Sequence, residues 1–136
     1  MSAVRDDVLA KVPDDGLRAY VVWTKILDED DLAAARKAAA SIHDPRVVQL
    51  WDGDAELART LGEALRIPVR EPGDRGFGLA WDVYLLYPAR ATWRERAPQP
   101  AFWMQQLEQM ETSPVPLLDA DVLRGEVAAA LPRAPR

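Results

Sequence analysis

Short apolar runs alternate with helix-like stretches in the first half of the chain. Residues 19–23 form a nearly continuous apolar run, as expected of a strand covered on both faces, and residues 46–51 form a second strand. Between them, residues 28–41 begin with four acidic residues and continue as an alanine-rich stretch, which predicts a helix capped by carboxylates. Two strands separated by a helix usually pair in parallel, so this half predicts a β-α-β unit.

The middle of the chain predicts a second helix and a strand. The helix follows residues 52–54 and ends before Pro68. Its apolar face consists of Leu57, Ala58, Leu61 and Leu65. Glycine and proline predict a loop over residues 69–78, and residues 81–87 are the clearest strand. Residues 88–90 predict a turn into a short antiparallel partner that carries Thr92 and Trp93.

Helical spacing is also present near both ends of the chain. Valine recurs every four residues at positions 4, 8 and 12, which predicts a short N-terminal helix. Residues 102–110 predict a helix whose apolar positions spread around more than half of its circumference. Asp119 is expected to cap a last helix, and residues 132–136 are expected to be a flexible tail. The inward side chains of that last helix are predicted to be Val122, Leu123, Val127 and Leu131.

The order strand, helix, strand, helix, two strands and helix resembles the thioredoxin-like superfamily, over roughly Arg18 to Leu131. Residues 20–23 resemble the strand that leads into the family's active-site loop, and residues 27–30 fall near its C-x-x-C motif. Residues 81–83 resemble the start of the strand that normally carries a cis-proline, with Asp82 near that proline's place. The resemblance implies a single α/β domain, 1–136, with a mixed central sheet flanked by helices on both faces and residues 1–18 as an extension.

The chemistry of that family cannot occur here through a thiol, because the chain has no cysteine. A helix N-terminus activates a thiolate by offering it positive potential. In this chain the corresponding helix start carries the carboxylates of residues 28–31, so an incoming anion would meet like charge. We therefore expect a divergent, cysteine-free member that fails as a disulfide reductase or thiol peroxidase.

Composition narrows the range of partners. The net charge is -5, with 17 basic residues scattered among 22 acidic ones and no basic run, so we expect no nucleic-acid partner. No apolar stretch approaches the ~20 residues of a membrane span, and residues 1–12 lack the apolar core of a signal peptide. The sequence therefore predicts a cytoplasmic protein that does not contact a membrane.

Five residues could converge where the family's active site would lie. They are Trp23, Thr24, Lys25, Trp81 and Asp82. A desolvated lysine there could be catalytic, but the favoured interpretation is a structural Lys25–Asp82 ion pair or two solvated side chains. A zinc site of several histidines and cysteines is excluded because His43 is the only histidine, and residues 28–31 lack the ligand pattern of a calcium loop. We expect no metal and no cofactor.

The apolar segment 102–110 supplies a candidate partner surface at Phe102, Trp103 and Met104, with core packing as the competing interpretation. The leading hypothesis is a non-redox binding or assembly module whose partner is another protein or a second copy of the chain. One alternative is an enzyme with a non-thiol pocket near Trp23, Lys25 and Asp82. Another alternative is a structural subunit of a larger complex.

Overall fold

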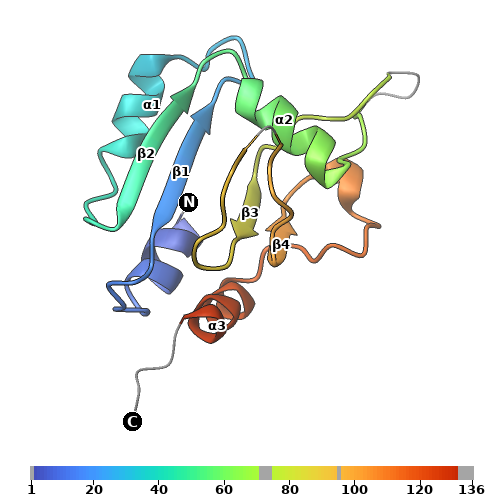
Figure 1. Ribbon diagram of the computed structural model, residues 1–136. Helices are drawn as coiled ribbons and strands as arrows, with labels where there is room; N and C mark the ends of the chain where they lie inside the picture. The colour runs from blue at the N-terminus through green and yellow to red at the C-terminus, as the bar shows by residue number, and fades with distance from the viewer. Residues whose placement is uncertain (1, 71–74, 95, 132–136) are drawn as a thin grey trace.

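A computed structural model describes residues 2–70, 75–94 and 96–131 and has a mixed α/β architecture (Figure 1). Two small sheets lie at the centre, and helices lie around them. The elements in chain order are the π-helical η1 (Ala3–Leu9), β1 (Ala19–Thr24), α1 (Leu32–Ala39), β2 (Val47–Asp52), α2 (Glu56–Leu65), β3 (Val83–Leu86), β4 (Phe102–Gln105), the 3-10 helix η2 (Glu108–Met110) and α3 (Ala120–Ala130).

The predicted β-α-β unit is confirmed. Strands β1 and β2 are parallel, with Tyr20 opposite Val48 and Val22 opposite Leu50. Helix α1 connects them and begins at Asp31, whose side chain accepts a 2.7 Å hydrogen bond from the amide of Ala34. This carboxylate satisfies one of the amides that the first helical turn leaves free, which is why the acidic run marks the helix start.

The second half differs from the sequence prediction. Strand β4 is the antiparallel partner of β3, with Val83 opposite Gln105 and Leu86 opposite Phe102. The expected helix over residues 102–110 is therefore wrong, and so is the expected hairpin partner that carried Thr92 and Trp93. The segment contains good helix formers, but pairing with a distant strand outweighs the weak local preference.

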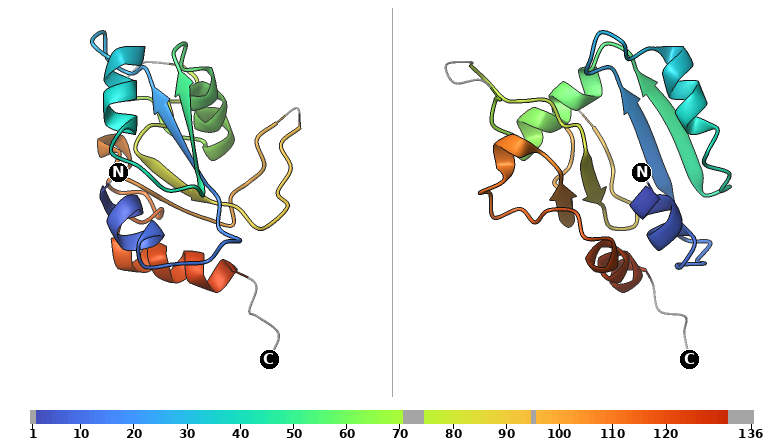
Figure 2. Two further views of the ribbon diagram at one scale, coloured as in Figure 1. Left: turned by 90° about the vertical axis from the view of Figure 1, so that its left-hand side faces the viewer. Right: turned by 180° about the vertical axis from the view of Figure 1, so that it is seen from behind.

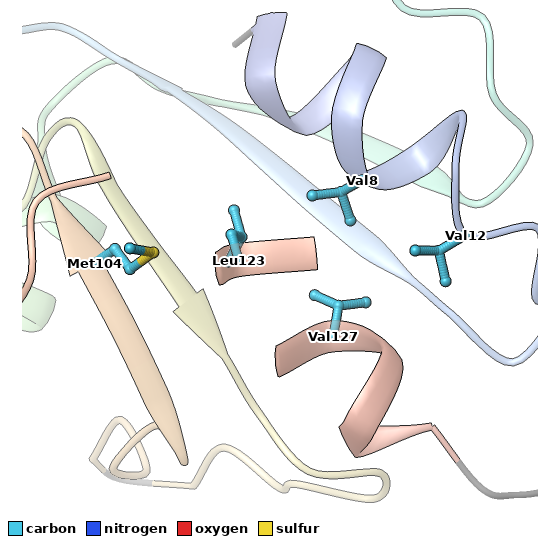
Figure 3. Close-up of a cluster of buried hydrophobic side chains, with 5 residues drawn as sticks. All are labelled: Val8, Val12, Met104, Leu123 and Val127. Carbon is cyan, nitrogen blue, oxygen red and sulfur yellow. The ribbon is translucent and has the colours of Figure 1, made fainter. Parts of the chain in front are cut away.

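The β3–β4 sheet packs against one core cluster on each face, which explains the apolar character of residues 102–110. A first core cluster contacts one face and joins η1, β4 and α3 (Figure 3). Its buried members are Val8, Val12, Met104, Leu123 and Val127. A second core cluster, which Trp103 packs against, has the buried members Leu61, Ile67, Ala80, Leu107 and Met110. Alternate residues of a strand point to opposite faces, so neighbouring residues of β4 enter different clusters.

The helices predicted near the two ends of the chain are observed, but Val122 was wrongly expected to point inward and is 46% exposed. Leu123 and Val127, one helical turn apart, form the buried stripe of the last helix, and Val122 lies beside that stripe. Asp119 caps α3 by accepting hydrogen bonds from the amides of Asp121 and Val122. Helix α2 ends before Pro68, with Arg66 in the left-handed region at a φ of 57°. Segment η1 packs against α3, so the expected N-terminal extension contributes buried side chains to the first core cluster. The expected tail, residues 132–136, lies outside the described residues.

The predicted single central sheet is replaced by two separate two-stranded sheets. Within the described residues, β1 pairs with β2 alone. Besides its pairing with β3, strand β4 forms one isolated bridge, between Gln105 and Leu117. The mixed α/β class is thus observed, while a thioredoxin-like topology stays a prediction. Within the same residues, no helix is both long and apolar enough to cross a bilayer.

Arg46 ties the β1–β2 unit to the N-terminal segment. Its guanidinium donates hydrogen bonds to the carbonyl oxygens of Leu9, at 2.6 Å, and Val12, at 2.5 Å. The same group forms an ion pair with Asp44, at 2.6 Å. The Arg46 side chain is only 13% exposed, so these contacts occur where water competes weakly. That guanidinium lowers the pKa of the Asp44 carboxyl to about 2.

Candidate functional site

The predicted pocket residues of β1 do not converge. The indole of Trp23 donates a 3.1 Å hydrogen bond to the side chain of Gln49, on the face that α1 covers. Thr24 is the next residue of the strand, so its side chain points to the opposite face. Lys25 follows the strand, and its amide donates to the carbonyl oxygen of Asp52. The alternation of the strand therefore separates side chains that are adjacent in the sequence.

The other two predicted residues have separate roles. Trp81 packs against the second core cluster. Asp82 is exposed, adopts a left-handed backbone with a φ of 49°, and its carbonyl oxygen accepts from the amide of Gln106. Burial raises the pKa of the Tyr84 hydroxyl, and the nearby charge of Asp82 raises it further. No ion pair among the described residues joins Asp82 to Lys25. Both residues are exposed, so of the two structural alternatives, that of two solvated side chains remains.

Two hollows lie next to this region and share Gln109. The larger has a volume of about 390 Å³ and is lined by Ile26, Val69, Arg70, Arg75, Phe77, Gly78, Leu79, Trp81 and Gln109. The smaller has a volume of about 290 Å³ and is lined by Leu65, Arg66, Pro68, Trp103, Gln109, Met110, Thr112, Ser113 and Val115. Trp81 is the one predicted pocket residue among these linings. Arg70, at the larger hollow, is paired at 3.0 Å with Glu108.

The candidate partner surface on residues 102–104 is corrected at Met104, while at Phe102 and Trp103 it stays a prediction. Met104 is 1% exposed and belongs to the first core cluster, and Phe102 packs against that cluster. Trp103 packs against the second core cluster and lines the smaller hollow. The physical reason is the strand geometry of β4, which directs neighbouring side chains toward two different cores. Met104 is fully buried as a result, and Phe102 and Trp103 are half-buried.

A different apolar surface is exposed, on β1 and β2. We call it the open face and define it by Tyr20, Val22, Val48 and Leu50. The side chain of Gln49 donates to the carbonyl oxygen of Ala39 in α1, so α1 covers the opposite face (Figure 2). On the open face, Tyr20 is 67% exposed, Val48 43% and Leu50 47%. The sequence did not predict this surface, because residues 19–23 have the apolar pattern of a strand that is covered on both faces.

One edge of the same sheet is strongly acidic. Residues 25–31 and 52–56 follow the carboxyl ends of two parallel strands and therefore meet at one edge, which we call the acidic edge. Its carboxylates are Asp28, Glu29, Asp30, Asp31, Asp52, Asp54 and Glu56, and its single basic residue is Lys25. Asp30 accepts hydrogen bonds from the amides of Leu27 and Ile26, which lower the pKa of its carboxyl.

Three of these carboxylates, those of Asp30, Asp31 and Asp52, accept hydrogen bonds from backbone amides. Asp52 accepts a 3.0 Å hydrogen bond from the amide of Ala58 in the first turn of α2. No group of three or more histidine, aspartate or glutamate side chains in the described part of the chain is arranged to hold a metal ion.

Comparison with protein-family models, with curated proteins and with solved structures finds no match.

Proposed function

We propose that this protein is a non-redox binding or assembly module that engages a protein partner through the open face. The exposure of Tyr20, Val48 and Leu50 on paired parallel strands carries the proposal. Parallel sheets are almost always covered on both faces, because both faces are apolar. Contiguous exposed apolar surface is typical of interaction sites. A partner that covers the open face would complete the sheet in the way that a second layer of helices does within other α/β folds.

The enzyme alternative has less support from the geometry. It required Trp23, Lys25 and Asp82 to share a pocket, and neither hollow described above includes any of the three. The alternative of a structural subunit makes the same demand as the binding module, because a subunit would also need a surface to contact its neighbours. The open face serves both, so one experiment tests them together.

The test is site-specific photocrosslinking in the cells that produce the protein. A photoreactive amino acid replaces Val48 on the open face, and the control variant carries it at Arg36, which is exposed on α1. We expect discrete adducts from position 48, identified by mass spectrometry, that disappear when Leu50→Glu is added. An absence of adducts from position 48, or adducts that survive Leu50→Glu and also form from position 36, would contradict the proposal.

A further inference from the structure

The loop between β3 and β4 carries the opposite charge to the acidic edge. Its described residues, 88–94 and 96–101, which we call the arginine loop, carry Arg90, Arg94 and Arg96. The sequence between β3 and β4 contains one acidic residue, Glu95. Trp93 in this loop is 44% exposed, which is unusual for so large an apolar side chain. Its ring packs edge-on against Tyr87, with the ring centroids 5.9 Å apart. An aromatic side chain among arginines has the composition of an interface centre.

The arginine loop and the open face lie on the same side of the molecule. In Figure 1 the loop, in gold, lies beside β1, and in the left view of Figure 2 it projects away from the sheet on the side opposite to α1. The open face is also opposite to α1, because Gln49 points toward that helix. One side of the molecule therefore presents the apolar open face with the acidic edge. The basic arginine loop, with its exposed indole, projects next to them.

A surface of this composition is complementary to itself. In a two-fold dimer each partner presents the same patch, so a group at one position meets a different group of the same patch. Two copies related in this way can each place the arginine loop over the other's open face. The arginines would then approach the carboxylates of the acidic edge, while Trp93 would contact Tyr20 and its neighbours. Opposite charges that face each other across an interface also favour this pairing over like-charged arrangements.

We propose that the partner of the open face is a second copy of this chain, which inserts its arginine loop against the open face and acidic edge in a two-fold dimer. This inference rests on the proposed function and names its partner. The two copies form two equivalent contacts, each between the loop of one copy and the face of the other. Both contacts combine apolar burial with ion pairing, so association should weaken as salt rises.

The first measurement is the mass of the purified protein by sedimentation over a range of concentrations. We expect a dimer, with a dissociation constant on the order of tenfold higher at 0.5 M than at 0.05 M salt, because salt screens exposed charges. Leu50→Glu on the face and Arg94→Glu in the loop should each give a monomer. Val122→Glu, which alters an apolar residue on α3 that is 46% exposed, and Arg36→Glu on α1 are the matched controls and should leave the dimer intact.

The decisive measurement mixes the two disrupted variants. The Leu50→Glu chain keeps an intact loop and the Arg94→Glu chain keeps an intact face, so a mixed dimer regains one of its two contacts. We expect the mixture to associate although neither variant does so alone. Circular dichroism confirms that each variant is folded. A wild type that stays monomeric at millimolar concentration and low salt, or a mixture that stays monomeric, would overturn the inference.

The crosslinking experiment separates the two proposals. Two differently tagged copies of the chain in one cell identify an adduct from position 48 that contains both tags, as the dimer requires. Adducts that contain only other proteins would support the binding module and refute self-association. An absence of any adduct from position 48 would refute the binding module itself.

Discussion

The backbone of Gly62 in α2 lies directly against the carbonyl oxygen of Gly78. A Cβ atom at Gly62 would stand 1.8 Å from that oxygen, and a Cβ atom at Gly78 would stand 2.5 Å from the carbonyl oxygen of Pro68. The contact brings the segment before β3 alongside α2, where the amide of Ala80 donates to the carbonyl oxygen of Ala58 at 2.9 Å. Gly62 thus allows α2 to approach the segment before β3 closely, and Gly78 allows that segment to approach Pro68.

Gly62→Ala should therefore destabilise the protein by about 3 kcal/mol or more, because backbone rather than a flexible side chain must move. The matched control is Gly125→Ala in α3, where a new Cβ meets no atom within 4 Å. Alanine is a better helix former than glycine, so this control should stabilise the protein by about 0.5–1 kcal/mol. Urea unfolding of the two variants measures both effects. Equal effects of the two substitutions would show that α2 and Gly78 are not in contact.

Arg46→Met should destabilise the protein, by about 2 kcal/mol. The substitution leaves the carbonyl oxygens of Leu9 and Val12 without their donor, and a buried acceptor that loses its partner carries a desolvation cost. Arg36→Met, at an exposed position of α1, is the matched control and should be nearly neutral. The free energy of unfolding from urea titration gives both values, and hydrogen exchange should show faster exchange in η1 only for Arg46→Met. Similar stabilities for the two variants would contradict the proposed tie.

The ion pair between Asp44 and Arg46 predicts a defined pH dependence. The pKa of Asp44 falls from 3.8 to about 2 because Arg46 hydrogen-bonds to the charged carboxylate. Since the folded state holds this proton less tightly than the unfolded state, the contribution is complete above about pH 4 and is lost as the pH falls toward 2. The stability difference between the wild type and Asp44→Asn should be constant from pH 7 to 5 and shrink from pH 4 to 2. A difference that stays constant down to pH 2 would refute this assignment.

Gln105 is a fully buried polar residue, at 0% exposure. Its side-chain oxygen accepts from the amide of Leu107 at 2.5 Å, and its side-chain nitrogen donates to the carbonyl oxygens of Met110 and Val115. Gln105→Ala should cost about 2–3 kcal/mol, because backbone groups that are buried would lose their partners. The exposed neighbour Gln106 is the control, and Gln106→Ala should cost less than about 1 kcal/mol. Thermal unfolding of both variants decides whether residues 105–115 depend on this side chain.

The sequence was sufficient to predict the helix caps, one helix end and the pairing of the first two strands. The carboxylates of Asp31 and Asp119 cap α1 and α3 as predicted, and the parallel pairing of β1 with β2 follows from a helix placed between two apolar runs. Proline after α2 marks its end, since proline cannot continue a helix. The caps and the helix end depend on residues within a few positions of each other, and the strand pairing follows from the order of the elements, so the sequence alone was sufficient for them.

Only the tertiary structure decided whether residues 102–110 form a helix, and which surface of the protein is open to a partner. Helix formers such as Met104, Gln105 and Leu107 favour a helix in isolation, but pairing with β3 and burial between two core clusters outweigh that preference. The predicted pocket failed for a related reason, because strand alternation separates Trp23 from Thr24. The open face was hidden from the sequence as well. The apolar pattern of a strand indicates that a face can be covered. Which element covers that face depends on contacts between distant parts of the chain.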